Sequence, residues 1–136
     1  KTETFYGENR GNVYEFAHTM VDAGADVVFG HGPHVTRAMD LYKDRFIIYS
    51  LGNFCTYGRF NLRGVNGIAP IVKVYTNHEG RFLKGEVIPI RQLGAGGPKI
   101  DPNNSVIKKI QELTKKDFPE INLLIDDSGF INYIDN

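Results

Sequence analysis

The sequence lacks several features that would assign a protein to a class at once. Its 136 residues contain one cysteine, Cys55, which excludes an internal disulfide and any cysteine-rich zinc site. Sixteen basic and sixteen acidic side chains cancel to a formal charge of zero, so charge gives no reason to expect nucleic-acid or membrane-surface binding. No run of 18 apolar residues and no charged-then-apolar leader is present. The sequence therefore predicts neither a membrane span nor a signal peptide in this segment.

The composition is otherwise that of a globular unit. With 41% hydrophobic residues, a chain of this length predicts one domain, residues 1–136, that can bury a core. We expect residues 1–93 to form the main helix and strand region. Residues 94–136 are expected to add a connector, a helix and a terminal hairpin.

The first periodic segment predicts an amphipathic helix. Asn12 is a plausible N-cap, and Glu15 follows it three residues later, as in a capping box. Apolar residues recur at i, i+3, i+4 and i+7, namely at Val13, Phe16, Ala17 and Met20. The helix is expected to end at Gly24. His18 lies off this stripe, so we expect it to face solvent.

Four further segments predict strands. Residues 26–30 and 45–50 are short and apolar, as in a buried, mostly parallel sheet. The stretch between them is expected to form a short turn of helix or a strand. Residues 71–76 and 82–90 alternate, and the four residues 77–80 between them predict a hairpin connection.

The chain breaks at the glycine- and proline-rich segment 94–104. After it, Asn104 or Ser105 is expected to cap a second amphipathic helix that ends near Phe118. The remaining residues predict a hairpin that turns at 127–129.

Two histidines follow the first apolar strand directly. Because open α/β folds bind ligands beyond the carboxyl ends of their strands, His31 and His34 form the first candidate site. Gly32 and Pro33 between them make a stiff turn that would let both imidazoles point into one pocket. Such a pair can bind a metal, act as a general base or hold a phosphate, and it can also be two turn histidines bonded to backbone carbonyls.

The whole segment 24–54 resembles one protein family. The matching residues are Gly24, Ala25, Asp26, Gly30, His31, Pro33, His34 and Val35, followed by Tyr49, Ser50, Leu51, Gly52, Asn53 and Phe54. Both blocks at this separation look like the CapA family of bacterial capsule and poly-γ-glutamate synthesis proteins. That family is similar in fold to the calcineurin-like metallophosphatases, whose last motif is a Gly-His turn that supplies imidazoles to a two-metal centre.

The resemblance implies a fold, a chemistry and a setting. The fold would be the C-terminal part of an α/β/β/α sandwich, with a mixed sheet and flanking helices. His31 and His34 would be catalytic residues and ligands of a divalent metal, whose bound water or hydroxide attacks a phosphoester. The expected partners are an anionic polymer or phosphoester substrate and the capsule synthesis machinery, and the expected location is the cell envelope or outside the cytoplasm.

Two departures from the family pattern bear on these expectations: the missing motifs indicate a fragment, and Gly32 favours a second hypothesis. Gly32 stands where relatives often carry a middle histidine, and no D-x-H or GDxxD motif occurs anywhere in the chain. We therefore expect a C-terminal fragment that is inactive alone. The alternative to a hydrolase is a non-catalytic component that binds an anionic polymer or assembles with the synthesis machinery.

The block YSLGNF supplies the remaining candidate residues. Ser50 and Asn53 follow the second strand, where Asn53 would orient His31 or bind an anionic substrate. Alternatively, Gly52 and Asn53 only make a turn that needs positive φ, while Phe54 fills the core. Downstream, Arg59 would suit a carboxylate or phosphate, or it is an ordinary solvated loop charge.

Overall fold

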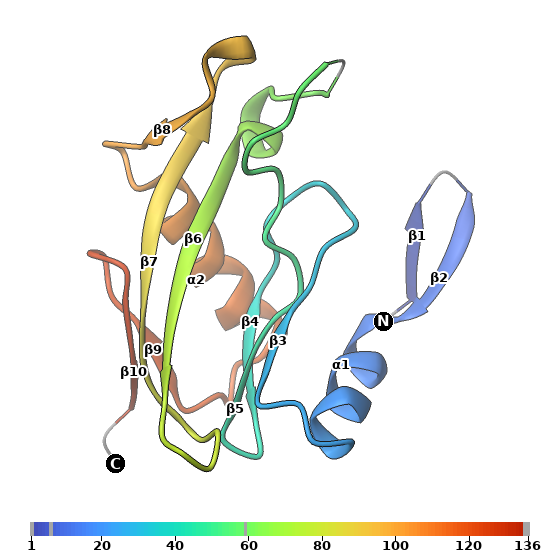
Figure 1. Cartoon of the computed structure of the whole chain (residues 1–136), viewed down its shortest axis with the longest axis vertical. Coiled ribbons are helices and arrows are strands. Elements are labelled where there is room, and N and C mark those ends of the chain that lie inside the picture. Colours follow the sequence, from blue (N-terminus) through green and yellow to red (C-terminus); the bar gives the residue numbers. More distant parts are fainter. Residues whose placement is uncertain (1, 6, 59, 135–136) are drawn as a thin grey trace.

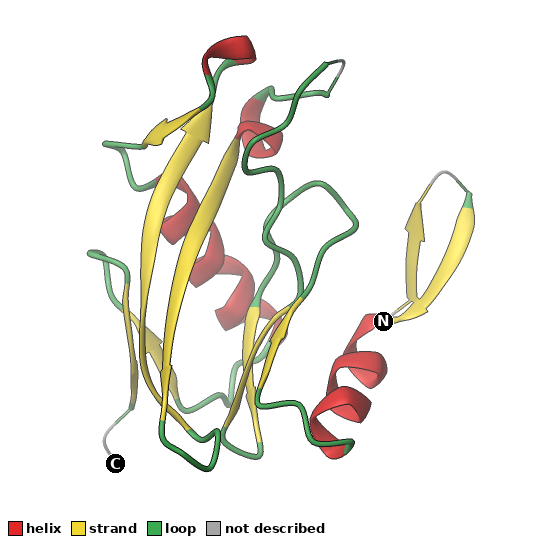
Figure 2. Ribbon diagram, viewed as in Figure 1, coloured by secondary structure: helices red, strands yellow, loops and turns green. Residues whose placement is uncertain are grey.

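Three β-sheets and two α-helices make up the chain in the computed structural model, which describes residues 2–5, 7–58 and 60–134 (Figures 1 and 2). The strands are β1 (Thr2–Phe5), β2 (Glu8–Asn12), β3 (Val27–Phe29), β4 (Met39–Tyr42), β5 (Arg45–Ile48), β6 (Ile68–Thr76), β7 (Phe82–Gln92), β8 (Pro98–Ile100), β9 (Leu123–Ile125) and β10 (Phe130–Tyr133). The helices are α1 (Val13–Asp22) and α2 (Ser105–Asp117), with the short 3₁₀ turns η1 (Gly64–Gly67) and η2 (Gly94–Gly96). The predicted mixed α/β class with flanking helices is confirmed.

The three-stranded sheet carries the candidate site. Its order is β3-β5-β4, with β3 parallel and β4 antiparallel to the central β5. Val28 lies beside Ile47 in the parallel pair, as the two apolar runs predicted. The parallel arrangement brings the carboxyl ends of β3 and β5 to the same edge of the sheet.

The five-stranded sheet is built on a long hairpin. β6 and β7 pair antiparallel along their length, and the predicted turn at 77–80 joins them. Asn77 Oδ1 holds that turn by accepting the backbone N–H groups of Glu79 and Arg81. β8, from the segment 94–104, pairs with the other end of β7, while β10 and β9 continue the sheet.

One main core lies between the two larger sheets and α2. Helix α2 contacts β6, β7 and β4, and in Figure 1 it passes behind the β6–β7 hairpin. The fully buried members of this core come from α2 and from strands of both sheets; the largest are Met39, Phe46, Ile48, Phe82, Val87, Ile107, Ile110 and Ile131. The three-stranded sheet is thus fixed from one side by apolar packing.

Helix α1 covers the opposite face of the three-stranded sheet (Figure 1). Its cap was predicted correctly, because Asn12 Oδ1 accepts the N–H groups of Tyr14 and Glu15. The buried stripe was predicted only in part: Ala17 is buried with Val21, one turn later, but Phe16 is 63% exposed. Adjacent helical positions lie about 100° apart, so a helix resting on Ala17 turns Phe16 outward.

His18 does not face solvent, which corrects the sequence prediction. Its side chain is 14% exposed, and its Nε2 lies 2.8 Å from an oxygen of Asp40 on β4. A polar side chain can occupy a packed helix face when it finds a partner there. That partner is 22 residues away in sequence, so helical periodicity alone gives no sign of it.

Helix α2 forms where predicted but is capped by a different residue. Asn104 takes a left-handed conformation and makes no capping bond. Instead, Asp101 Oδ2 accepts the N–H of Ser105, and Asp101 Oδ1 accepts that of Asn103. Burial alone would raise the pKa of Asp101, but these hydrogen bonds outweigh burial and hold that pKa below its usual value.

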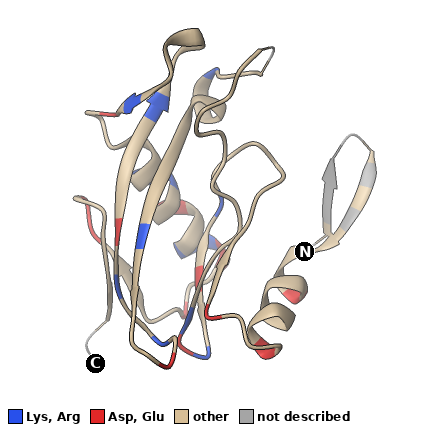
Figure 3. Ribbon diagram, in the orientation of Figure 1, with Lys and Arg blue, Asp and Glu red and all other residues tan. Residues whose placement is uncertain are grey.

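Basic and acidic residues are both distributed over the strands, helices and loops of the described residues (Figure 3), consistent with the balanced composition. None of the helices in the described ranges has both the length and the hydropathy required to cross a bilayer.

Candidate functional site

The candidate site begins where β3 and β5 end side by side (Figure 1). The Gly30 N–H donates to the Ile48 carbonyl, and the Leu51 N–H donates back to the Gly30 carbonyl at 3.0 Å. The two chains approach so closely that a Cβ on Gly30 would overlap the Tyr49 carbonyl oxygen. Only glycine fits at this point, which explains the Gly-His junction in the sequence.

His34 is held by a reciprocal pair of hydrogen bonds with Asn53. Its Nδ1 lies 3.0 Å from Asn53 Oδ1, and Asn53 Nδ2 donates to the His34 carbonyl at 3.0 Å. The same Nδ2 also donates to the Asn66 carbonyl at 3.1 Å, which fixes the orientation of the amide. Because Oδ1 can only accept, Nδ1 of His34 carries the proton, and in the neutral ring Nε2 carries the lone pair.

The backbone of His34 is unusual as well. With φ at 61°, it occupies the left-handed region that side-chain-bearing residues seldom adopt. Such a conformation costs on the order of 1–3 kcal/mol and persists when the surroundings enforce it, most often at functional positions. Here the enforcing group is Asn53, which is only 5% exposed and uses both ends of its amide within the loop cluster.

The turn after β5 brings Asn53 to this position. Gly52 has a φ of 73°, and a Cβ on it would lie 2.9 Å from the Thr36 nitrogen. Ser50 is fully buried, and its Oγ accepts the Gly52 N–H at 3.2 Å. Ser50 therefore stabilises the turn from inside. Phe54, which was expected to fill the core, is 44% exposed.

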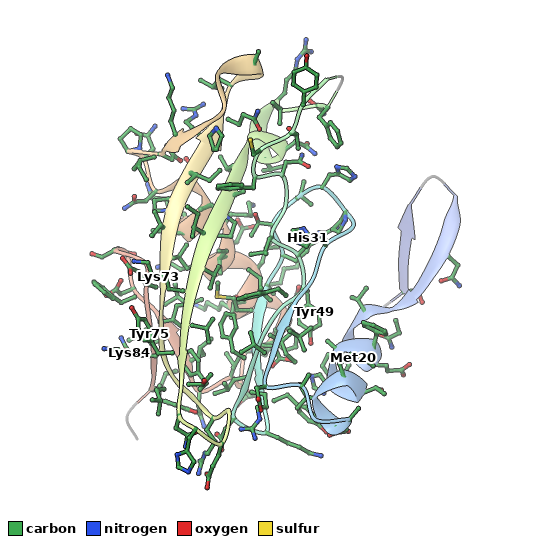
Figure 4. All side chains as sticks on the ribbon, viewed as in Figure 1. Met20, His31, Tyr49, Lys73, Tyr75 and Lys84 are labelled. Atoms are coloured by element: carbon green, nitrogen blue, oxygen red, sulfur yellow. The ribbon has the colours of Figure 1, made fainter. Side chains whose placement is uncertain are left out.

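The two histidines differ in their surroundings. His31 is exposed (Figure 4), and among the described residues its side chain makes no hydrogen bond, ion pair or ring contact. Asn53 therefore orients His34 rather than His31. Within the described part of the chain, no group of three or more His, Cys, Asp or Glu side chains is placed to hold a metal ion. Arg59 lies outside the described residues.

A buried polar network behind the loops was missed by the sequence analysis. The carboxylate of Asp40 accepts hydrogen bonds from His18 Nε2 and from the Tyr49 hydroxyl, both at 2.8 Å, and from the Leu41 N–H. Burial, together with the neighbouring Asp40 carboxylate, raises the pKa of Tyr49 far above its usual value. The one available signal was an aspartate within the apolar run of β4, MDLY.

Comparison with known proteins identifies the segment that holds these residues. Residues 8–57 match the family described as "Bacterial capsule synthesis protein PGA_cap". A capsule biosynthesis protein CapA from Bacillus anthracis is 60% identical over 38 residues, which are 28% of this chain and 9% of that protein. A PGA biosynthesis protein CapA from Bacillus subtilis is 36% identical over 103 residues, 74% of this chain and 26% of that protein. The match places residues 8–57 of this chain in that family of bacterial capsule synthesis proteins.

Another relative comes from Mycobacterium tuberculosis. It is a probable polyglutamine synthesis accessory protein, 42% identical over 38 residues, or 28% of this chain and 10% of that protein. The chain spans about a quarter or less of the length of these three relatives. The family match includes α1, both histidines, Ser50 and Asn53.

Proposed function

We propose that this chain provides the histidine loop of a metal-dependent, phosphoesterase-like centre that acts in capsule or poly-γ-glutamate biogenesis. The observation that carries the proposal is the bond between His34 Nδ1 and the buried Asn53 amide. Histidines that bind metals usually donate their second ring N–H to an acceptor, which fixes the tautomer and the direction of the ring. Asn53 supplies that acceptor, which places the lone pair of the neutral ring on Nε2.

The donor set in the described residues is incomplete for a catalytic metal. His31 and His34 offer two imidazoles, whereas catalytic zinc sites typically use three protein ligands and keep one position for water. No third ligand accompanies them within the part of the chain that the structure describes. Further ligands would have to come from other residues, and a metal held there would lower the pKa of a bound water.

The roles we assign to this chain's own residues are limited. His34 would hold the metal or the proton of a reacting group, and Asn53 would keep its ring in place. Arg59 remains the proposed contact for an anionic substrate, by the bidentate hydrogen bonding that arginine offers. Direct substrate contact by Ser50 or Asn53 would require the turn to open, because both side chains are buried.

A second candidate function is a non-catalytic component that binds an anionic polymer or the synthesis machinery. It is favoured by the incomplete donor set and by Gly32 at the position between the histidines. In this case the His34–Asn53 pair would shape a binding loop instead of a reacting centre.

One experiment separates the two. Metal content and hydrolysis of aryl phosphate mono- and diesters are measured for the full-length protein that contains this chain and for its His34→Ala variant, with His78→Ala as a matched control. His78 is an exposed histidine at the tip of the β6–β7 hairpin, 89% exposed, and its loss should change nothing. We expect metal and hydrolysis to disappear in His34→Ala, and Asn53→Ala to weaken metal affinity about 10- to 100-fold.

The opposite result has a definite meaning. If the wild type holds no metal and hydrolyses neither ester, the hydrolase proposal fails. Binding of poly-γ-glutamate that is weakened by His34→Ala but not by His78→Ala would then support the second candidate.

A further inference from the structure

A cavity of about 540 Å³ lies beside the histidine loop. Its walls come from the start of α1, from Pro33 of the loop, from the end of β5 and from the last turn of α2. Three aromatic rings line it, those of Tyr14, Tyr49 and Phe118. Its size is that of a small-molecule pocket, for which 300–1,000 Å³ is typical.

The aromatic wall is fixed before any ligand arrives. Phe118 stacks on Tyr49 with ring centroids 5.6 Å apart and on Tyr14 at 6.2 Å. The Tyr49 hydroxyl is anchored on buried Asp40, and the Tyr14 ring packs 3.9 Å from the ring of His18, which binds the same carboxylate. Figure 4 shows Tyr49 on the side of the sheet that faces α1. A wall held in this way loses little conformational entropy on binding.

Two opposite charges line the same cavity. Arg37 is exposed, and its guanidinium makes no hydrogen bond or ion pair with any described residue. By contrast, Arg45 and Arg81 each pair with an aspartate. Asp117 is the second charge; it is exposed, and among the described residues it has no ion-pair partner, Arg37 included.

The position of Asp117 is electrostatically unfavourable. It is the last residue of α2, where the helix dipole presents its negative end and a carboxylate is destabilising. The fold thus keeps a carboxylate and a guanidinium at one apolar pocket without letting them neutralise each other. A ligand that carries both charges would satisfy both groups.

We propose that this cavity binds a zwitterion with an apolar body, in the size range of an aromatic amino acid to a dipeptide. Arg37 would receive the carboxylate by bidentate hydrogen bonds, and Asp117 would receive the ammonium group. The apolar body would lie against Tyr14, Tyr49 and Phe118, whose ring faces also favour a nearby cation. This binding requires no metal and no hydrolysis, so it goes beyond the function proposed above.

The test matches changes in the protein with changes in the ligand. Binding of L-phenylalanine and of L-phenylalanyl-L-phenylalanine to the full chain is measured by calorimetry, beside their N-acetyl and C-amide forms. Arg37→Gln and Asp117→Asn are compared with Arg63→Gln, an exposed arginine that does not line this cavity. Thermal melting confirms that each variant is folded.

We expect at least one of the two zwitterions to bind, with each variant weakening it about tenfold and the control leaving it unchanged. The decisive result comes from pairing each variant with the ligand that lacks the matching charge. The C-amide form, which has no carboxylate, should bind Arg37→Gln and wild type with equal affinity. The N-acetyl form, which has no ammonium group, should bind Asp117→Asn and wild type with equal affinity. No binding of either zwitterion up to millimolar concentration would overturn the proposal, as would equal affinity for zwitterion and blocked ligand. Binding that survives in His34→Ala keeps this result separate from the outcome of the hydrolase test.

Discussion

Removing the Asp40 carboxylate should strongly destabilise the protein. Asp40 is 5% exposed and accepts hydrogen bonds from His18, Tyr49 and the Leu41 N–H. In Asp40→Ala the His18 ring and the Tyr49 hydroxyl lose their acceptor while they remain in a packed interface. A buried donor left without its acceptor costs about 1–3 kcal/mol, so two such donors should cost several kcal/mol of the roughly 5–15 kcal/mol that stabilises a typical domain.

Urea denaturation followed by circular dichroism measures this loss, provided that the slope m is unchanged. Tyr49→Phe removes one bond to a charged group and should cost about 1.5–3 kcal/mol. In the Asp40→Ala background the same change should cost almost nothing, because the hydroxyl is already orphaned. The exposed pair of Lys73 and Glu86 is the control, and Lys73→Ala should cost less than about 1 kcal/mol. An Asp40→Ala loss as small as the control would refute the reasoning.

Three further changes have definite expected outcomes. Gly30→Ala forces a Cβ onto the Tyr49 carbonyl and should lower the melting temperature by several degrees or prevent folding, as read by calorimetry. Asp101→Ala removes the cap of α2 and should cost about 1–2 kcal/mol at neutral pH. Since the folded pKa of Asp101 is lowered, that stabilisation is present above the unfolded pKa of about 4 and is lost as pH falls through the folded pKa, so the variant and wild type should converge in acid. The pKa of Tyr49 is raised, so in an ultraviolet titration its phenol should stay protonated at pH values above the usual tyrosine pKa of about 10, and Tyr49→Phe should leave the absorbance change in that range unaltered.

The elements that sequence reasoning predicted well are those with local signals. The Asn12 cap depends on partners two and three residues away, and the hairpin at 77–80 depends on its own turn residues. Parallel pairing of β3 with β5 followed from two short apolar runs, and it correctly placed both strand ends at one edge. These features need no knowledge of the rest of the fold.

The features that were missed depend on distant partners or on backbone details. His18 became buried because Asp40 lies opposite it, 22 residues along the chain. The cap of α2 moved to Asp101 because Asn104 adopts a left-handed turn, which a propensity argument does not show. At the site, the sequence predicted that Asn53 would orient His31, whereas Asn53 is bonded to His34, since a choice between two histidines three residues apart requires the geometry of the loop.

The buried network and the histidine loop depend on the same strand. Tyr49, which donates to Asp40, is followed directly by Ser50, whose hydroxyl holds the turn that presents Asn53 to His34. Any movement of β5 along its axis would therefore displace Asn53 and, with it, the imidazole ring of His34. The backbone hydrogen bond between Leu51 and Gly30 would limit such a slip on the β3 side of β5, and the Asp40 carboxylate would oppose it from β4, on the other side of β5. Three hydrogen bonds satisfy the buried Asp40 carboxylate. The same bonds hold the end of β5, which carries the candidate site, in one defined position.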